Sequence, residues 1–192
     1  MRKLIWQMMV SLDGFMEGPN RELDWHVTDG DFNRYVTEVL TSTDAILLGR
    51  VTYQLFADYW PSSTDSEAPM MNDLPKIVFS RTLEQARWKN SRVVKENIEA
   101  EIDALKRQAG KDLALFGSAD LASTFMRLGL IDEYRILVNP VVLGSGRPMF
   151  RGIEDRAHLT LSTTRTLSSG VVILSYHPGP GSMPTHREDR RD

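Results

Sequence analysis

The segment Ala45-Ile46-Leu47-Leu48-Gly49-Arg50-Val51-Thr52 joins a short apolar run to a glycine, an arginine and the start of a helical pattern. The run 45–48 is typical of a buried strand, and the pattern after it predicts a helix over about 52–59. Strands separated by helices are characteristic of α/β sheets. In such sheets, ligands bind beyond the carboxyl ends of the strands, where helix N-termini point. This segment therefore indicates both a fold class and a place for a site.

Strand-like and helical patterns alternate on both sides of this segment. From Asp31 onward the apolar residues recur at helical spacing, and Asp29 or Thr28 can cap that helix. Further strands are predicted over 4–11, 76–80, 93–94 and 112–116, and further helices over 98–109, ending at Gly110, and over 119–128. Strands separated by helices favour a parallel sheet with right-handed crossovers.

The C-terminal part of the chain is rich in β patterns. The stretch 134–143 is strand-like except at Asn139-Pro140, and 159–167 and 171–176 are typical of a hairpin around 168–170. The segment 61–75 carries prolines among Ser, Thr and Asp, and is predicted to be a surface loop. The expected fold class is α/β, with a mixed, mostly parallel sheet flanked by helices and a C-terminal antiparallel hairpin.

Composition limits the classes of protein that fit. The 192 residues, 41% of them hydrophobic, suit one domain, which we place at residues 1–177. Residues 178–192 hold one large apolar side chain, Met183, and are expected to form a flexible tail. The chain has 23 Lys and Arg against 26 Asp and Glu, and this net charge of −3 argues against a nucleic-acid partner. It has no cysteine, which excludes disulfides and thiolate chemistry.

Membrane and export signals are not evident in the sequence. No apolar run is long enough to span a bilayer. The short apolar run after Met1-Arg2-Lys3 lacks a small-residue cleavage site, so we expect no signal peptide. The expected location is cytoplasmic, without association with a membrane.

Three predicted strand ends carry groups that suit a nucleotide. Gly49-Arg50-Val51-Thr52 offers helix-start amides and a guanidinium for a phosphate, although a turn with a solvated arginine fits as well. Ser80-Arg81-Thr82 suits the phosphate that distinguishes NADP from NAD, or a turn with capping hydroxyls. Gly117-Ser118-Ala119 suits a pyrophosphate over a helix N-terminus, or a plain tight turn. None of them is the GxGxxG fingerprint, so a two-domain Rossmann dehydrogenase is not supported.

The loop 11–18, which follows the first strand, is a candidate lid because its glycines permit movement. Several carboxylates lie in or after it, and turn formation and helix capping are the alternative roles for them. Trp25 is the candidate to contact a planar ligand, with packing as the alternative. No two histidines stand at i and i+4, and there is no HExxH motif or EF-hand loop, so no metal site is expected.

Six segments, taken in order, resemble the dihydrofolate reductase-like superfamily, and more closely its branch with the reductase domain of riboflavin biosynthesis, the RibD C-terminal domain. They are Ser11-Leu12-Asp13-Gly14-Phe15, Leu23-Asp24-Trp25, Leu48-Gly49-Arg50-Val51-Thr52-Tyr53, Val78-Phe79-Ser80-Arg81, Phe116-Gly117-Ser118-Ala119 and Asn139-Pro140-Val141-Val142-Leu143-Gly144-Ser145-Gly146. The resemblance covers roughly residues 3–177. It implies a reductase, expected as a homodimer, that binds NADPH and passes a hydride to a pteridine-like or pyrimidine substrate.

The resemblance also implies roles for individual residues. Gly49, Arg50, Val51 and Thr52 match the family's phosphate-binding helix start, Ser80 and Arg81 its adenosine-phosphate contact, Gly117, Ser118 and Ala119 its pyrophosphate turn, and Ser11 and Asp13 the start of the loop over the nicotinamide. The pyrophosphate turn usually holds a pair of glycines, where this chain has Gly117-Ser118. The family's substrate-protonating acid falls near Gly30, and the candidate proton donors here are Asp24, Asp29 and Asp31, besides water.

Two hypotheses of different kinds remain. The first is a stand-alone NADPH-dependent reductase that acts on a small pteridine- or pyrimidine-like molecule. The second is a non-catalytic dinucleotide- or pterin-binding protein of the same fold, which the undefined position of the acid supports. An assay of NADPH oxidation separates the two.

Overall fold

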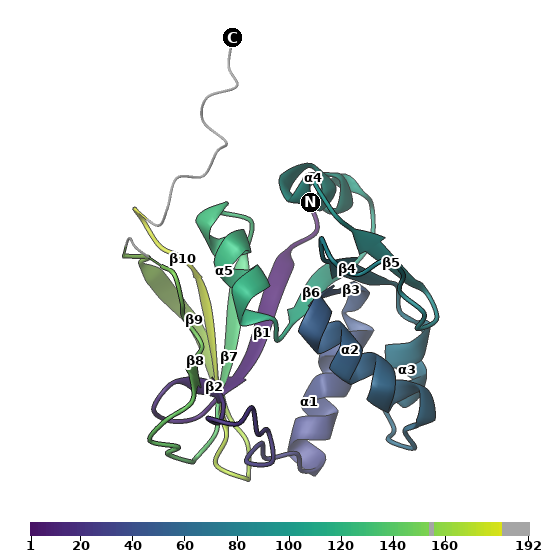
Figure 1. The fold of residues 1–192 in the computed structure, drawn as a ribbon. Coiled ribbons are helices and arrows are strands. Elements are labelled where there is room, and N and C mark those ends of the chain that lie inside the picture. The colour runs from purple at the N-terminus through teal and green to yellow at the C-terminus, as the bar shows by residue number, and fades with distance from the viewer. Residues whose placement is uncertain (154–155, 182–192) are drawn as a thin grey trace.

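The computed structural model describes residues 1–153 and 156–181. Eight strands form one sheet in the order β5-β4-β3-β6-β1-β7-β10-β9 (Figure 1). They are β1 (Leu4–Val10), β3 (Thr43–Gly49), β4 (Lys76–Phe79), β5 (Ser91–Val94), β6 (Asp112–Phe116), β7 (Glu133–Val138), β9 (Leu159–Thr166) and β10 (Val172–Pro178). All pairs from β5 to β7 are parallel, whereas β10 runs antiparallel to both β7 and β9. The predicted mixed sheet with a C-terminal antiparallel hairpin is confirmed.

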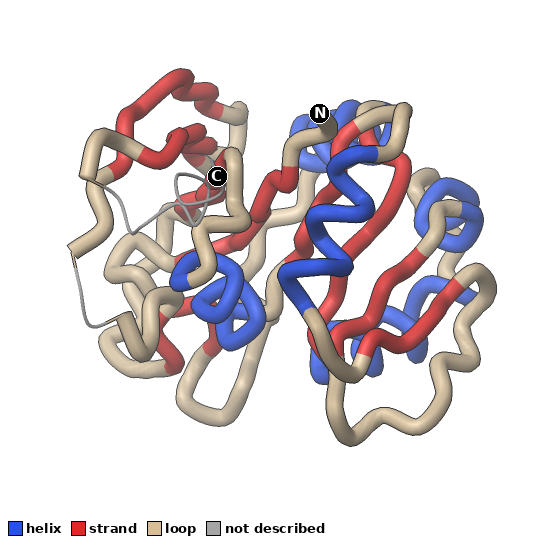
Figure 2. Tube along the Cα trace, turned by 90° about the horizontal axis from the view of Figure 1, so that it is seen from above, coloured by secondary structure: helices blue, strands red, loops and turns tan. Residues whose placement is uncertain are grey.

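Helices cover both faces of the sheet, as the view from above shows (Figure 2). They are α1 (Gly30–Thr41), α2 (Arg50–Tyr59), α3 (Ala68–Asp73), α4 (Ile98–Arg107) and α5 (Ala119–Arg127), with a 3₁₀ turn η1 (Trp60–Ser62) after α2. Buried residues of α1, α2 and α3 pack on one face of the sheet, and those of α4 and α5 pack on the other. Both faces are therefore part of the core.

The strands are apolar on both sides because both faces are covered. In β3, Leu47 packs against the α4 and α5 face, while Ile46 and Leu48 pack against the opposite face. All three side chains are fully buried. Successive strand side chains point to opposite faces, so a central parallel strand needs an uninterrupted apolar run rather than an alternating one. The run 45–48 meets this requirement.

Local signals placed most of the helices correctly. Asp29 caps α1, since its side chain accepts a hydrogen bond of 2.8 Å from the backbone N–H of Phe32. The predicted helices after Asn97 and after Ser118 are present as α4 and α5. α1 thus begins where an N-terminal cap residue stands in the sequence.

The prediction of a surface loop over residues 61–75 was wrong. The segment contains α3, whose Met71 is buried against Leu40 and Val78. Pro69 lies in the first turn of this helix, where proline is favoured because the missing N–H has no intrahelical partner. The ammonium group of Lys76 donates hydrogen bonds to the carbonyls of Met71 and Asn72 at the end of α3. Composition alone did not show this buried face.

Two further corrections concern the C-terminal part. The strand predicted over 134–143 ends at Val138, and a loop follows it. Two short strands that the sequence did not predict, β2 (Phe15–Glu17) and β8 (Arg147–Pro148), pair in a small separate sheet.

The proposed end of the domain at residue 177 lies close to the end of the last strand. β10 continues to Pro178, and the N–H of Gly179 donates to the carbonyl of His158 over 2.7 Å. Most of the tail predicted to be flexible, residues 182–192, lies outside the described residues. Among the described helices, none combines the length and the apolar character that crossing a membrane requires.

Candidate functional site

The carboxyl ends of β4, β3 and β6 lie next to one another at one edge of the sheet, because these strands are parallel neighbours. From this edge, α2 follows β3 onto one face of the sheet and α5 follows β6 onto the other. Open α/β sheets bind ligands in the crevice where neighbouring connections diverge in this way. The three strand-end turns predicted from the sequence therefore lie side by side at the position where this fold binds ligands.

Two hydrogen bonds join the turn before α2 to the turn before α5. The N–H of Gly49 donates to Ser118 Oγ over 2.8 Å, and the Ser118 hydroxyl donates to Thr52 Oγ1 over 2.8 Å. The approach is close, since a Cβ on Gly49 would lie 3.0 Å from Ser118 Oγ. A Cβ on Gly117 would lie 3.3 Å from the Thr52 side chain. The two helix starts are thus held against each other.

Neither of these helix starts has a side-chain cap. Gly49, the N-cap of α2, has no side chain, and Ser118, the N-cap of α5, directs its hydroxyl to the neighbouring turn. The first N–H groups of a helix have no intrahelical partner, and they carry the positive end of the helix dipole. Two such ends at one crevice form a place for an anion such as a phosphate.

The hydrogen bonds of the Ser118 side chain explain why a serine is tolerated at the position where the family resemblance implies a second glycine. Both Gly117 and Ser118 adopt left-handed backbone conformations, with φ of 56° and 55°. A residue with a Cβ loses roughly 1–2 kcal/mol in that region. The two hydrogen bonds of the Ser118 hydroxyl offset this loss, because glycine could not make them. The Ser118 hydroxyl therefore links the two turns through hydrogen bonds.

The predicted arginines are available for a ligand. Arg50 is exposed, and its guanidinium reaches Gln54 Oε1 at 3.1 Å, one helical turn further on. Arg81 is also exposed and forms no hydrogen bond or ion pair within the described part of the chain. Ser80 instead caps its own turn, because its Oγ accepts the N–H groups of Thr82 and Leu83. The turn with a capping hydroxyl is thus present after β4, and the contact of Ser80 and Arg81 with a phosphate stays a prediction.

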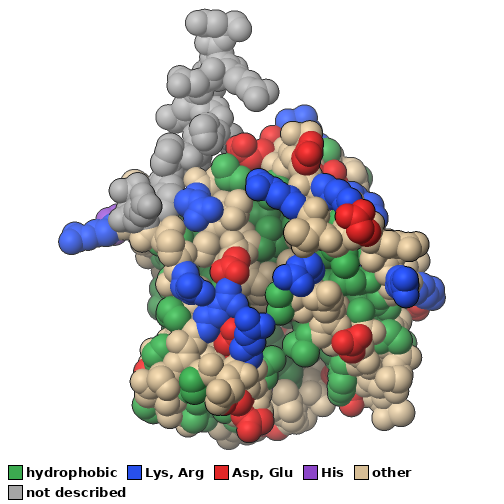
Figure 3. Space-filling view, in the orientation of Figure 1, with side chains coloured by type: hydrophobic (Ala, Val, Ile, Leu, Met, Phe, Trp, Pro, Cys, Tyr) green, Lys and Arg blue, Asp and Glu red, His purple; other side chains and the backbone are tan. Residues whose placement is uncertain are grey.

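Two of the remaining predicted contacts differ sharply in exposure. Val51 is 53% exposed at the start of α2, whereas Ala119 is 2% exposed and packs in the core. At Ala119, only the backbone is therefore in a position to meet a ligand. Lys and Arg side chains gather, with acidic ones among them, on the face of the molecule that Figure 1 presents (Figure 3).

The predicted lid, residues 11–18, is fastened to a second loop, residues 140–149, and we call the two together the flap. Asp13 is the main connection, since its carboxylate accepts the Ser11 hydroxyl and the N–H groups of Leu143 and Gly144. These hydrogen bonds, above all that from the Ser11 hydroxyl, hold the pKa of Asp13 below its ordinary value. Ser11 is buried. Both residues thus shape the flap, and contact with a nicotinamide stays a prediction.

Asn139 interrupts a predicted strand and begins one of the segments that carry the family resemblance, but no role was assigned to it from the sequence. It is fully buried, and its side chain donates to the carbonyls of Val10 and Leu137 and accepts the N–H of Val27. It therefore connects the ends of β1 and β7 to the segment before α1. Nothing in the sequence indicated this role, because the contacts with Val10 and Val27 join residues more than a hundred positions apart.

The three candidate proton donors have different surroundings. Asp29 caps α1. Asp31 accepts hydrogen bonds from Ser168 and forms an ion pair with Arg34. The contacts with Ser168 lower the pKa of Asp31, so it is ionised at neutral pH and poorly suited to donate a proton. Asp24 is exposed. The helix-capping alternative thus holds for Asp29, and the assignment of a proton donor stays a prediction.

Trp25, the predicted substrate contact, is half-buried. Its indole N–H donates to the carbonyl of Glu22 over 3.0 Å, and its ring meets that of His26 edge to face at 4.3 Å. Burial lowers the pKa of His26 to about 4, so the imidazole is neutral at pH 7. His26 Nε2 is buried without a hydrogen-bond partner among the described residues. This polar atom was not identified from the sequence, where a lone histidine carries no positional signal.

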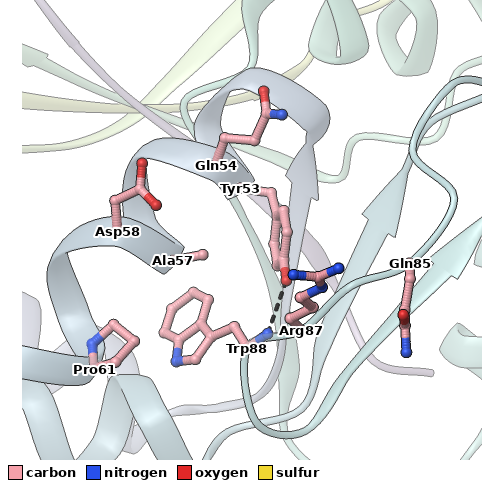
Figure 4. Close-up of a pocket in the computed structure, with 8 residues that line it drawn as sticks. All are labelled: Tyr53, Gln54, Ala57, Asp58, Pro61, Gln85, Arg87 and Trp88. Carbon is pink, nitrogen blue, oxygen red and sulfur yellow. Dashed lines mark hydrogen bonds between the residues drawn. The ribbon is translucent and has the colours of Figure 1, made fainter.

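A separate recess of about 300 Å³ lies on the flank of α2 (Figure 4). It is lined by Tyr53, Gln54, Ala57, Asp58, Pro61, Gln85, Arg87 and Trp88. Tyr53 and Trp88 meet at its floor, where the Tyr53 hydroxyl accepts the N–H of Trp88 over 2.9 Å (Figure 4). None of the residues predicted from the sequence lines this recess, so the candidate site is the crevice and not the recess. Over the residues described, no three His, Asp or Glu side chains gather as metal ligands would.

The fold and the crevice define a class: a protein with the dihydrofolate reductase-like architecture and a strand-end site. The chain belongs to the family of the RibD C-terminal domain, which matches residues 2–173. It is 41% identical over 182 residues to the uncharacterized protein YyaP of Bacillus subtilis, covering 92% of this chain and 95% of that protein.

Solved structures agree on the fold. A putative riboflavin biosynthesis protein from Shewanella sp. PV-4 superposes with a TM-score of 0.74 at 21% identity, covering 92% of this chain and 99% of the other. Dihydrofolate reductase from Enterococcus faecalis, in complex with NADP(H), gives a TM-score of 0.61 at 14% identity, over 92% and 96% of the two chains. At such identities the likeness establishes the fold alone.

Proposed function

We propose that this protein is an NADPH-dependent reductase that transfers a hydride to a small pteridine- or pyrimidine-like substrate. The observation that carries the proposal is the pair of uncapped helix starts, of α2 and α5, joined through Ser118 at the crevice. Membership of the RibD C-terminal domain family supports it, and so does the NADP(H) complex of the enterococcal enzyme with the same fold.

The residues at the crevice suit a phosphorylated dinucleotide. The N–H groups at the starts of α2 and α5 would hold the pyrophosphate, and Arg50 lies at the first position of α2. The exposed Arg81, on the turn after β4, would meet the additional phosphate of NADPH. Bound NADPH supplies the hydride. The flap would exclude water, and Trp25 would form part of the wall around a planar substrate.

A second candidate is a binding protein of the same fold without turnover. The structure offers one specific reason for it: Asp29 and Asp31 are engaged in contacts that fasten α1. Water or the exposed Asp24 would then be the proton source for a reductase. Binding of NADPH without oxidation, for all of the substrates tested, would favour this second candidate.

The test combines binding with turnover. NADPH and NADH dissociation constants are measured by fluorescence titration, and NADPH oxidation is followed by absorbance with dihydrofolate, pterin and ribosylaminopyrimidine substrates. Arg50→Ala should weaken the binding of both cofactors, because its guanidinium would meet the phosphates that NADPH and NADH share. Arg81→Ala should weaken the affinity for NADPH about tenfold to a hundredfold and leave the affinity for NADH unchanged.

Arg107 lies on α4 and pairs with Asp103, and Arg107→Ala is the matched control. It should change the affinity for neither cofactor. Equal losses of NADPH and NADH in Arg81→Ala would refute the role of Arg81. A wild-type protein that binds neither cofactor would refute the proposed function.

A further inference from the structure

One ion-pair network joins the flap to the helix that starts at the crevice. Arg147, on β8, contacts Glu17 Oε1 at 3.2 Å and Asp120 Oδ2 at 2.5 Å. Glu17 lies on the paired strand β2, opposite Arg147 in the register, and Asp120 is the second residue of α5. The guanidinium therefore lies beside the Gly117-Ser118-Ala119 turn, although no sequence motif included it.

The two carboxylates of this network differ in how firmly they hold the arginine. The Glu17 side chain is 13% exposed, while that of Asp120 is 74% exposed. An exposed ion pair contributes little because water competes for both partners, so the contact with Asp120 is the one that can be exchanged. The contact with the better buried Glu17 is shielded from water and is the firmer of the two.

Arg147 also has donor capacity that the protein does not use. Its Nε is buried and has no hydrogen-bond partner among the described residues. A guanidinium binds a phosphate through two parallel N–H donors, and such pairs are stronger than a single contact with a solvated carboxylate. The first N–H groups of α5, which have no intrahelical partner, belong to the same turn of the helix as Asp120.

The flap reaches α5 in a tightly built arrangement. At Gly146, directly before Arg147, φ is +150°, and a Cβ there would lie 2.3 Å from the carbonyl oxygen of Glu17. The N–H of Met149 donates to the carbonyl of Gly14 over 3.0 Å, which joins the two loops again on the other side of Arg147. A displacement of Arg147 would thus move both loops of the flap.

We propose that Arg147 is a further dinucleotide-binding residue, whose guanidinium leaves Asp120 for a phosphate oxygen at the start of α5 and so fastens the flap over the cofactor. Asp120 forms the ion pair with Arg147 when no phosphate is bound, and its negative charge opposes the incoming phosphate. The inference rests on the proposed function, because it assumes that a pyrophosphate binds at this turn.

The test is a set of NADPH titrations by fluorescence with wild type, Arg147→Gln, Asp120→Asn and the double variant. Arg147→Gln should weaken the affinity for NADPH about tenfold to a hundredfold. Asp120→Asn should increase that affinity severalfold, since one opposing charge is removed. In the Arg147→Gln background, the Asp120→Asn substitution should have a smaller effect, because no guanidinium is left to release.

A second probe distinguishes phosphate binding from support of the fold. Adenosine 2′-monophosphate lacks the pyrophosphate, and its affinity should be the same in wild type and Arg147→Gln. Arg147→Lys, which keeps the charge without the planar fork, should retain part of the NADPH affinity. Arg127→Gln, at the far end of α5, is the control and should behave like wild type.

Four outcomes would overturn the inference. Unchanged NADPH affinity in Arg147→Gln would exclude contact with the phosphate. Equal weakening by Asp120→Asn and Arg147→Gln would mean that the ion pair persists in the complex and is structural. If Arg147→Gln does not fold, a loss of affinity in Asp120→Asn contradicts the exchange by itself. A wild-type protein that binds no NADPH overturns the proposed function together with this inference, whereas normal wild-type binding with unchanged variants overturns the inference alone.

Discussion

Replacing Ser118 with alanine tests whether its hydroxyl fastens the two helix starts. The substitution removes the hydrogen bonds to Gly49 N–H and to Thr52 Oγ1, each 2.8 Å long and part-buried. At about 1 kcal/mol for each bond, the free energy of unfolding should fall by about 2 kcal/mol. Alanine keeps the Cβ, so the cost of the left-handed backbone at φ 55° stays.

Replacing Ser118 with glycine separates the two contributions. Glycine loses the same hydrogen bonds but adopts a positive φ without the steric cost, which returns about 1 kcal/mol. The order of stability should therefore be wild type, then Ser118→Gly, then Ser118→Ala, in steps of about 1 kcal/mol. For a domain of this size, the melting temperature should fall by about 2–4 °C at each step.

Urea unfolding followed by circular dichroism measures these differences. Thr124→Ala is the matched control, because this hydroxyl bonds to the carbonyl of Asp120 on the exposed side of the same helix, and its loss should cost less than about 0.5 kcal/mol. A Ser118→Ala variant as stable as wild type would contradict this role of the hydroxyl. A Ser118→Ala variant more stable than Ser118→Gly would contradict the backbone cost assigned to the left-handed conformation.

Three further predictions concern the buried Lys76, the buried Asn139 and the assembly. Burial lowers the pKa of Lys76 from 10.5 to about 8, so between these values the unfolded chain binds more protons. Raising the pH from about 8 to about 10 should therefore stabilise wild type relative to Lys76→Met in urea unfolding, and a constant difference would contradict the shift. Asn139→Ala should lower the unfolding free energy by about 3 kcal/mol, since two buried hydrogen bonds and one part-buried hydrogen bond are lost, and thermal melts that match wild type would refute this. The homodimer implied by family resemblance is expected to use the edge strand β9, which is mostly exposed and carries no lysine or proline over 159–166. Analytical ultracentrifugation should then show a wild-type dimer and a monomeric Thr163→Lys variant. A wild-type monomer would exclude the homodimer.

Much of the fold followed from local patterns. The buried strand 45–48, the cap at Asp29 and the C-terminal hairpin depend on spacing and on residues near one another in the chain, and the structure has all three. The error over 61–75 has a local cause as well, since prolines and small polar residues suit the first turn of a helix as well as a loop. The buried position of Met71, which decides between the two, depends on α1 and β4 and is not a local property.

The sequence by itself determined which turns carry the glycines and arginines that a phosphate needs, because those residues directly follow apolar strand runs. Parallel strand order then brings the ends of β3, β4 and β6 to one edge. Only the tertiary structure decided what each side chain contacts there. Ser118 meets Gly49 and Thr52, Asp13 holds the loop at Leu143, and Arg147 reaches Asp120. These contacts join residues 27 to 130 positions apart, and distances between such residues are set by the packing of whole elements, which no local pattern encodes.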